Sequence, residues 1–241
     1  MSLFSKIEWT EATWNPVTGC TKISEGCKYC YAERLSIRLK SMKNPRYING
    51  FDVTLHDNLL DIPLNWIKPR MIFVNSMSDL FHEKVPLEFI EKVFDIILRA
   101  RHHKFQILTK RSERLKELAS KLVWPANLWM GVTVELEEYS YRINHLKETP
   151  AKIKFISFEP LLGSFKKLDI EGVDWIIVGG ESGPNSRMMK KEWVIAIKDQ
   201  ALKIGLPFFF KQWGGKNKKK GGRLLDGNMW DQMPVDYSKL F

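Results

Sequence analysis

The 241-residue chain contains only three cysteines and no uninterrupted apolar run of 18 residues. An odd number of cysteines cannot pair completely into disulfides, which argues against a disulfide-stapled secreted domain. Because a long apolar run is missing, a membrane-spanning helix is not expected. The first sixteen residues also lack the apolar block of a secretory signal. We therefore expect a cytoplasmic protein with no membrane partner.

Several nucleotide-binding and metal-binding motifs are missing as well. The sequence has no Gly-x-Gly-x-x-Gly dinucleotide fingerprint and no phosphate loop of the nucleotide-hydrolase kind. Its five histidines form neither a His-Glu-x-x-His pair nor a zinc-deaminase signature. These absences argue against a dinucleotide-dependent enzyme, a nucleotide hydrolase and a zinc hydrolase.

Positive charge is in excess, with 38 Lys and Arg against 28 Asp and Glu and a net charge of +10. This excess favours polyanions as partners, and nucleic acid is the commonest polyanion. The segment 211–223 holds six basic residues, no acidic residue and four glycines. Such a loop is suited to phosphate contacts, although a solvated charge run explains it equally well. Trp213 and Trp230 bracket the basic part and are able to stack on a base.

Apolar runs alternate with amphipathic stretches along most of the chain. The predicted strands cover 71–74, 105–108, 128–134, 153–158, 175–178 and 206–210. The predicted helices cover 31–42, 86–101, 112–122, 137–147 and 191–204. Strands that alternate with helices predict parallel pairing through right-handed crossovers. We therefore expect an α/β fold, with a full or partial parallel (β/α) barrel.

The domain organisation follows from the same pattern. We expect a single barrel domain over residues 1–241, with a basic C-terminal extension from about residue 214. The segment 44–69 has weak periodicity and is predicted to be a loop-rich insertion. The C-terminal extension is predicted to be ordered but without regular structure.

Polar residues follow each predicted strand, at the edge where parallel α/β folds collect function. Four carboxylates and two lysines are among them: Asp79, Glu135, Glu159, Glu181, Lys110 and Lys211. If these side chains converge in one mouth, they are buried charges that need partners or a ligand. The sequence GGESG at 179–183 permits close approach to a ligand, but a tight turn explains it as well.

All three cysteines fall within eleven residues, at Cys20, Cys27 and Cys30 in CTKISEGCKYC. Three thiolates suit an iron–sulfur cluster that leaves one iron for a small molecule. Tetrahedral zinc needs a fourth ligand from elsewhere, and His82 is a candidate, although a plain loop histidine is the simpler interpretation. Two tryptophans ahead of the cysteines, Trp9 and Trp14, are predicted to shield the cluster from water.

This cysteine stretch lies after a short first strand and before the first helix of a β/α series. In that position it resembles the radical S-adenosylmethionine superfamily, whose motif has spacings of three and two and an aromatic residue before the last cysteine. Here Tyr29 is that aromatic residue, while the first spacing is six. Longer segments resemble a phage- and bacterium-associated family of uncharacterised three-cysteine proteins, distantly related to the same superfamily. They are WTEATWNPVTGCTKISEGCKYCYAE, FVNSMSDLFHE, ILTKR, ISFEPLLG, WIIVGGESGP and PFFFKQWGG.

The resemblance implies a barrel of the radical S-adenosylmethionine type, in which the three cysteines hold a [4Fe–4S] cluster that chelates S-adenosyl-L-methionine. By position, the residues implied to bind this cofactor are Tyr29, Asn75, Ser76, Asp79, Lys110, Thr133, Glu135, Gly179 and Gly180. Asn75, Ser76 and Asp79 correspond to the site of the methionine amino group. Lys110 is implied to neutralise the carboxylate and Glu135 to hold the ribose, with the two glycines near the adenine.

The implied activity is that of a radical enzyme. An external donor of the flavodoxin or ferredoxin type reduces the cluster, and S-adenosylmethionine is cleaved to a 5′-deoxyadenosyl radical that abstracts hydrogen. Glu159, Glu181 and Lys211 are left as catalytic candidates toward a nucleic acid or nucleotide that is modified or repaired. Two other classes stay open, a zinc-stabilised nucleic-acid-binding protein and a non-radical iron–sulfur redox protein. The sequence leaves the oligomeric state open.

Overall fold

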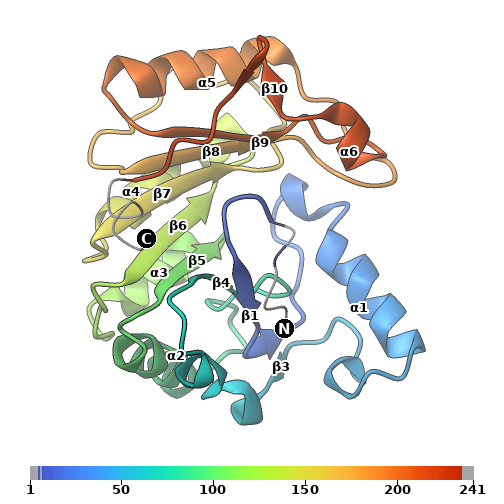
Figure 1. Cartoon of the computed structure of the whole chain (residues 1–241), viewed down its shortest axis with the longest axis vertical. Helices are drawn as coiled ribbons and strands as arrows, with labels where there is room; N and C mark the ends of the chain where they lie inside the picture. Colours follow the sequence, from blue (N-terminus) through green and yellow to red (C-terminus); the bar gives the residue numbers. More distant parts are fainter. Residues whose placement is uncertain (1–4, 6, 235–241) are drawn as a thin grey trace.

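The computed structural model describes residue 5 and residues 7–234, apart from the side chains of residues 218 and 219. Seven parallel strands form one sheet in chain order (Figure 1). They are β1 Ala12–Trp14, β4 Met71–Val74, β5 Lys104–Thr109, β6 Leu128–Thr133, β7 Ile153–Phe158, β8 Trp175–Gly179 and β9 Phe208–Gln212. Because β1 and β9 are the two edge strands and do not pair with each other, the barrel is partial. The prediction of a parallel (β/α) fold is confirmed.

Most helices begin within a residue or two of the predicted positions. They are α1 Tyr31–Ser41, α2 Leu87–Arg99, α3 Ser112–Ala119 and α5 Lys191–Lys203, whereas α4 Tyr141–Lys147 begins four residues later than predicted and α6 Lys218–Gly221 was not predicted. A 3₁₀ turn at Glu137–Tyr139 takes the place of the first part of the helix expected at 137–147. The connection from β7 to β8 contains no helix. None of the helices in the described part of the chain is long and apolar enough to cross a bilayer.

Alternation along the strands gives the sheet two different apolar faces. The outward face packs against the helices through residues such as Ile72, Val74, Ile107, Val132, Ile156 and Val178. The inward face forms a second cluster of Trp9, Met71, Phe73, Trp129, Phe155, Trp175, Ile177 and Phe209. Large aromatic side chains therefore fill the inside of the barrel below the ends of the strands. As in other parallel barrels, polar chemistry is left to the carboxyl ends.

The tryptophans ahead of the cysteines do not shield them, so that prediction is wrong. Trp9 packs inside the barrel, with its ring centroid 4.7 Å from that of Phe73 and 6.2 Å from that of Trp175. Trp14 packs in the outer core against Phe105, and its indole N–H donates to the Leu59 carbonyl at 2.8 Å. Both rings are buried because of their position in the chain. Trp14 belongs to the fully buried strand β1, and Trp9 shortly precedes it.

Two short antiparallel strand pairs were not predicted. In the loop-rich region, β3 Thr54–Leu55 pairs antiparallel with β2 Val17–Thr18, which lies directly before the cysteine stretch. In the C-terminal extension, β10 Leu224–Leu225 pairs with β11 Asn228–Met229. The turn between β10 and β11 is Asp226–Gly227, with φ of 52° and 77°, as a type I′ turn requires. The expectation of an extension without regular structure is therefore wrong.

Candidate cofactor site at the carboxyl ends of the strands

The segment 19–30, called the cysteine loop below, joins β2 to α1. Its first residue, Gly19, forms a parallel bridge with Ser78 in the turn after β4. Gly19 has φ of 83°, and a side chain there would overlap the backbone of Asp52. All three cysteines are free of disulfides and partly exposed. The loop is thus anchored at the carboxyl end of β4 with its thiols unused by other covalent bonds.

Arg111, the second residue after β5, holds the first half of the cysteine loop. It is 6% exposed, and its Nη2 donates to the carbonyl and the hydroxyl of Thr21 at 3.1 and 2.8 Å. Its Nη1 lies 3.5 Å from Cys20 Sγ and 3.5 Å from Asp79 Oδ2. Its Nε donates to both oxygens of Glu83. One guanidinium therefore connects the loop to the ends of β4 and β5.

Asp79, predicted to contact the cofactor, fastens two strand ends in this structure. Its Oδ1 accepts from the Phe81 N–H at 3.0 Å and from the Thr109 hydroxyl at 2.7 Å. Its Oδ2 accepts from the Lys110 N–H at 3.1 Å. With Arg111 also against Oδ2, the carboxylate is buried among donors and orients the guanidinium that reaches the loop.

His82 supports the same loop through two hydrogen bonds. Its Nδ1 accepts from the Lys84 N–H at 3.1 Å, which leaves Nε2–H to donate to the Thr21 hydroxyl at 2.9 Å. Burial lowers the pKa of His82, and the Arg111 charge lowers it further, so the ring is neutral at pH 7. Both ring nitrogens of the candidate fourth zinc ligand are therefore engaged within the protein.

The environment of Cys20 disfavours a free thiolate. Burial, with the Asp79 carboxylate adding to it, raises the pKa of the Cys20 thiol to about 12 against the opposing effect of Arg111. Because a protonated thiol is a poor nucleophile, thiol catalysis is not expected here, and metal ligation would release a proton. Within residues 5 and 7–234, no three His, Cys, Asp or Glu side chains are grouped around one metal position. A cubane cluster binds each thiolate at a different iron, so its ligands need not converge on a point.

Glu135, two residues beyond β6, contacts the middle of the cysteine loop. Its carboxylate is completely buried, and Oε1 accepts from the Ser24 hydroxyl of the loop. Ser24 Oγ also lies 3.6 Å from Cys27 Sγ. On the other side, Arg142 Nη1 donates to Glu135 Oε2 at 2.7 Å, and Lys110 Nζ lies 3.9 Å from Oε1. Glu135 therefore connects the end of β6 to Ser24, whose hydroxyl in turn contacts Cys27.

Glu181, two residues beyond β8, acts on the loop through Arg187. Arg187 donates from Nη2 to Oε1 at 2.7 Å and from Nε to Oε2 at 2.9 Å. The same Nη2 donates to the Glu25 carbonyl at 2.8 Å, and the guanidinium lies 5.4 Å from the centroid of the Tyr29 ring. Burial opposes ionisation of Glu181, but the hydrogen bonds from Arg187 more than offset it and hold the pKa of Glu181 below its usual value.

This shift predicts a pH-dependent contribution of Glu181 to stability. Because the folded pKa is depressed, the carboxylate stabilises the fold above its ordinary value of 4.5, and the contribution is lost as pH falls through the folded pKa. We expect the free energy of unfolding of Glu181→Gln to be about 1–3 kcal/mol lower than that of wild type at pH 7. This difference should shrink below pH 4.5. Urea unfolding at both pH values measures it, with exposed Glu171→Gln as the control. A loss that is the same at both pH values would contradict the prediction.

A second polar group forms at the ends of β7, β8 and β9. Lys211 Nζ donates to Glu159 Oε1 at 2.6 Å, and Gln212 Nε2 lies 3.4 Å from the same oxygen. Gln212 Nε2 also donates to the Ser182 hydroxyl at 2.9 Å. Gly179 leaves room for the carboxylate, since a Cβ there would lie 3.4 Å from the carboxyl carbon of Glu159. Three predicted residues, Glu159, Gly179 and Lys211, are thereby brought together.

Buried polar atoms at the carboxyl ends of the strands that have no hydrogen-bond partner in the described part of the chain include Asn75 Nδ2, Ser157 Oγ and Gln212 Oε1. Asn75 has φ of 60°, a left-handed conformation that favours glycine, and its Oδ1 accepts from the Val17 N–H at 3.2 Å. An unpaired buried donor or hydroxyl destabilises the protein by about 1–3 kcal/mol unless water or a ligand satisfies it. The carboxyl edge of the sheet thus offers unused hydrogen-bonding capacity to a small molecule.

The remaining predicted residues lie around these groups. Ser76 Oγ donates to Asn15 Oδ1 at 3.1 Å, and the Thr133 carbonyl accepts from Arg142 at 2.8 Å. Gly180 packs against backbone, because a Cβ there would overlap the Trp213 carbonyl. The carbonyl of Cys30 accepts from the first turn of α1. Gly180 therefore serves close packing of β8 against the segment after β9.

Three arginines of the site were not predicted as site residues: Arg111 and Arg187, which contact the cysteine loop, and Arg142, which contacts Glu135. Each pairs with a predicted carboxylate, Asp79, Glu135 or Glu181. A signal was available, because a buried carboxylate needs a cation and Arg142 and Arg187 follow their partners by seven and six residues.

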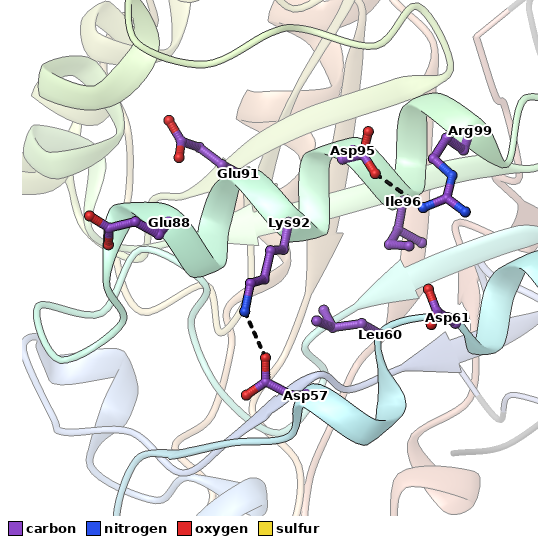
Figure 2. A pocket seen from close by; sticks show the side chains of 9 residues that line it. All are labelled: Asp57, Leu60, Asp61, Glu88, Glu91, Lys92, Asp95, Ile96 and Arg99. Atoms are coloured by element: carbon purple, nitrogen blue, oxygen red, sulfur yellow. Dashed lines mark hydrogen bonds and ion pairs between the residues drawn. The ribbon is translucent and has the colours of Figure 1, made fainter.

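A surface groove of about 450 Å³ lies away from these residues, between α2 and the turns after β3 (Figure 2). It is lined by Asp57, Leu60, Asp61, Glu88, Glu91, Lys92, Asp95, Ile96 and Arg99. Lys92 pairs with Asp57 at 2.9 Å and Arg99 with Asp95 at 3.3 Å, both at the surface. None of the predicted site residues reaches this groove.

Fold and site together define an open parallel β/α barrel with a cysteine loop fastened over the carboxyl ends of its strands. The chain belongs to the family described as "Protein of unknown function (DUF5131)", whose model matches residues 4–234. A comparison with curated proteins found no match.

Solved structures similar to this chain include several forms of spore photoproduct lyase. A double mutant of that lyase with bound AdoMet and dinucleoside spore photoproduct is 10% identical, with a TM-score of 0.48 over 79% of this chain and 61% of that chain. A cysteine-to-serine mutant is 12% identical, with a TM-score of 0.48 over 80% and 62%. The lyase complexed with dinucleoside spore photoproduct is 10% identical, with a TM-score of 0.46 over 78% and 59%. The chain thus spans about three fifths of the length of these structures.

Proposed function

We propose that this protein is a radical S-adenosylmethionine enzyme. The observation that supports this best is the anchoring of the cysteine loop at three strand ends. Arg111 holds it after β5, Glu135 after β6, and Glu181 holds it through Arg187 after β8. Free cysteines on a loop tied over a parallel sheet are placed where such folds bind cofactors.

The three cysteines, Cys20, Cys27 and Cys30, would be the ligands of a [4Fe–4S] cluster. When bound, the reduced cluster and S-adenosylmethionine supply one-electron cleavage of a carbon–sulfur bond and abstraction of a hydrogen atom from the substrate. The electron comes from an external donor of the flavodoxin or ferredoxin type.

Asn75 Nδ2 and Ser157 Oγ are unpartnered polar atoms that a cofactor at this edge would satisfy. Because Asn75 Oδ1 already accepts from a backbone N–H, its free atom is the Nδ2 donor. A donor suits an oxygen of the methionine carboxylate or the ribose, rather than the amino group that the resemblance implies. Lys110, 3.9 Å from Glu135, adds positive charge beside the same carboxyl edge.

The pair formed by Lys211 and Glu159 is assigned to the substrate. It lies at the ends of β7 and β9, apart from the contacts of the cysteine loop, and is largely buried. Lys211 Nζ and Glu159 Oε1 are 2.6 Å apart. The lysine can therefore donate a proton to the substrate while the carboxylate accepts one. The net charge of +10 favours an anionic substrate, a nucleic acid or nucleotide that is modified or repaired.

Anaerobic reconstitution of the wild-type protein with iron and sulfide tests the proposal. We expect about four irons per chain, a brown chromophore, and conversion of S-adenosylmethionine to methionine and 5′-deoxyadenosine under dithionite. A colourless protein with one bound zinc would contradict the proposal and support a structural zinc site instead. A chromophore without cleavage of S-adenosylmethionine would favour a redox protein instead.

A further inference from the structure

Helix α1 leaves a mixed apolar and basic face exposed. It fully buries only Ala32 and Ser36, while the positions spaced at i, i+3, i+4, i+7 and i+11 from its first residue lie together on another side. That side consists of Tyr31, Arg34, Leu35, Arg38 and Met42, all of them exposed. The stripe begins directly after Cys30, so it runs outward from the cysteine loop over roughly 16 Å of helix.

The positive charges of this region are largely free of counter-ions. The segment 28–46 contains six basic residues and one acidic residue, Glu33, which pairs with Lys22 at 2.8 Å. In the described part of the chain, Arg38 forms no ion pair. Among the described residues, Arg34 donates to a backbone oxygen, the Ser182 carbonyl at 3.4 Å, and its charge also helps to lower the pKa of Glu181. These cations are therefore available to an external anion.

The same surface continues into the basic loop after β9. Segment 181–183, which Arg34 reaches from α1, is hydrogen-bonded to Gly215 through two backbone bonds of 2.8 and 3.0 Å. Lys216 and Lys220 follow and are exposed. In Figure 1, α6 accordingly lies near the N-terminal end of α1. We call Arg34, Arg38, Lys216 and Lys220 the basic rim.

Positive charge is not spread evenly over the protein. The groove in Figure 2 carries five carboxylates against two cations. A polyanion is therefore repelled from the groove beside α2 and attracted to the rim beside the cysteine loop.

We propose that the basic rim binds a single strand of nucleic acid and positions it beside the cysteine loop. The Tyr31 hydroxyl donates to the Ser76 carbonyl, which holds a half-exposed ring beside the site as a stacking surface for a base. Residues recessed at the strand ends are reached by an unpaired base and not by one stacked in a duplex. The inference rests on the proposed function only in treating the bound strand as the substrate.

Fluorescence anisotropy of a labelled single-stranded oligonucleotide tests the rim in the full chain. The rim variant is Arg38→Glu with Lys216→Glu. The control is Lys68→Glu with Lys152→Glu, which makes the same charge change at exposed residues ahead of β4 and β7, at the opposite ends of the strands. We expect the rim variant to bind at least about tenfold more weakly and its salt slope to fall by about 1.4, while the control binds like wild type. Tyr31→Ala should weaken binding with little change in the salt slope.

Equal losses in both double variants, no binding by wild type, or tighter binding of a duplex than of a single strand would each overturn the inference. So would a rim variant that loses affinity for polyglutamate but not for the oligonucleotide, since that points to an acidic protein partner. If the charge-reversed variant is unfolded by circular dichroism, Arg38→Gln with Lys216→Gln takes its place. A separate measurement tests the proposed function. If that function is wrong, the reconstituted wild-type protein will not cleave S-adenosylmethionine.

Discussion

Cys27→Ala is expected to abolish both the brown chromophore and the cleavage of S-adenosylmethionine. Removing one thiolate leaves two ligands for a cluster that needs three from this chain. The fold should persist, because Cys27 is partly exposed and its Sγ makes a long hydrogen bond of 3.6 Å with Ser24 Oγ. Parallel anaerobic reconstitution of wild type and variant, with iron analysis, visible spectra and product quantification, measures the loss.

Two companion variants make this result specific. Ser24→Ala removes the hydroxyl that contacts Glu135 and leaves every thiol, so we expect it to retain iron. His82→Ala removes the candidate zinc ligand and should also retain iron. Normal iron content and normal cleavage in Cys27→Ala would refute the cluster assignment, whereas loss of one zinc in His82→Ala would support a three-cysteine, one-histidine zinc site.

The sheet was predictable because its strands are short apolar runs between polar turns. Strands β4 and β7 have the bounds expected from sequence, β6 and β8 differ by one residue at one end, and β5 differs by one residue at each end. Strand β9 is shifted, from 206–210 to Phe208–Gln212, because Lys211 and Gln212 are polar residues within a buried strand. Their partners, Glu159 and the Gly180 carbonyl, come from the two preceding strands of the sheet. A local pattern does not contain that information.

The candidate site was predictable to a similar extent. Carboxylates that follow successive parallel strands must share one edge, and Asp79, Glu135 and Glu181 all contact the cysteine loop directly or through an arginine. Their arginine partners were not foreseen, although Arg142 and Arg187 follow their carboxylates closely in sequence, because an arginine on a helix or loop is usually exposed. Arg142 is the extreme case, because it lies within a predicted amphipathic helix and is 1% exposed.

Arg142→Met is expected to cause the largest loss of stability among the site variants. Its ion pair with Glu135 is 2.7 Å long, with side chains 1% and 0% exposed. Methionine preserves much of the packing volume but removes the cation that donates to the buried carboxylate, and the nearby Lys110 Nζ is 3.9 Å from the other oxygen. Breaking such a pair from one side lowers the free energy of unfolding by about 3–5 kcal/mol. Urea unfolding at pH 7 measures the change.

The exposed pair of Arg99 and Asp95 supplies the matched control, since Arg99→Met should lose less than about 1 kcal/mol. Adding Glu135→Gln to Arg142→Met removes the uncompensated charge and should restore a large part of the stability, because the neutral amide still accepts from the Ser24 hydroxyl. If the double variant is no more stable than Arg142→Met, the lost packing against Tyr139, 4.3 Å from the guanidinium, explains the effect instead. Restored stability would show that the charge of Glu135, held beside the cysteine loop, depends on Arg142.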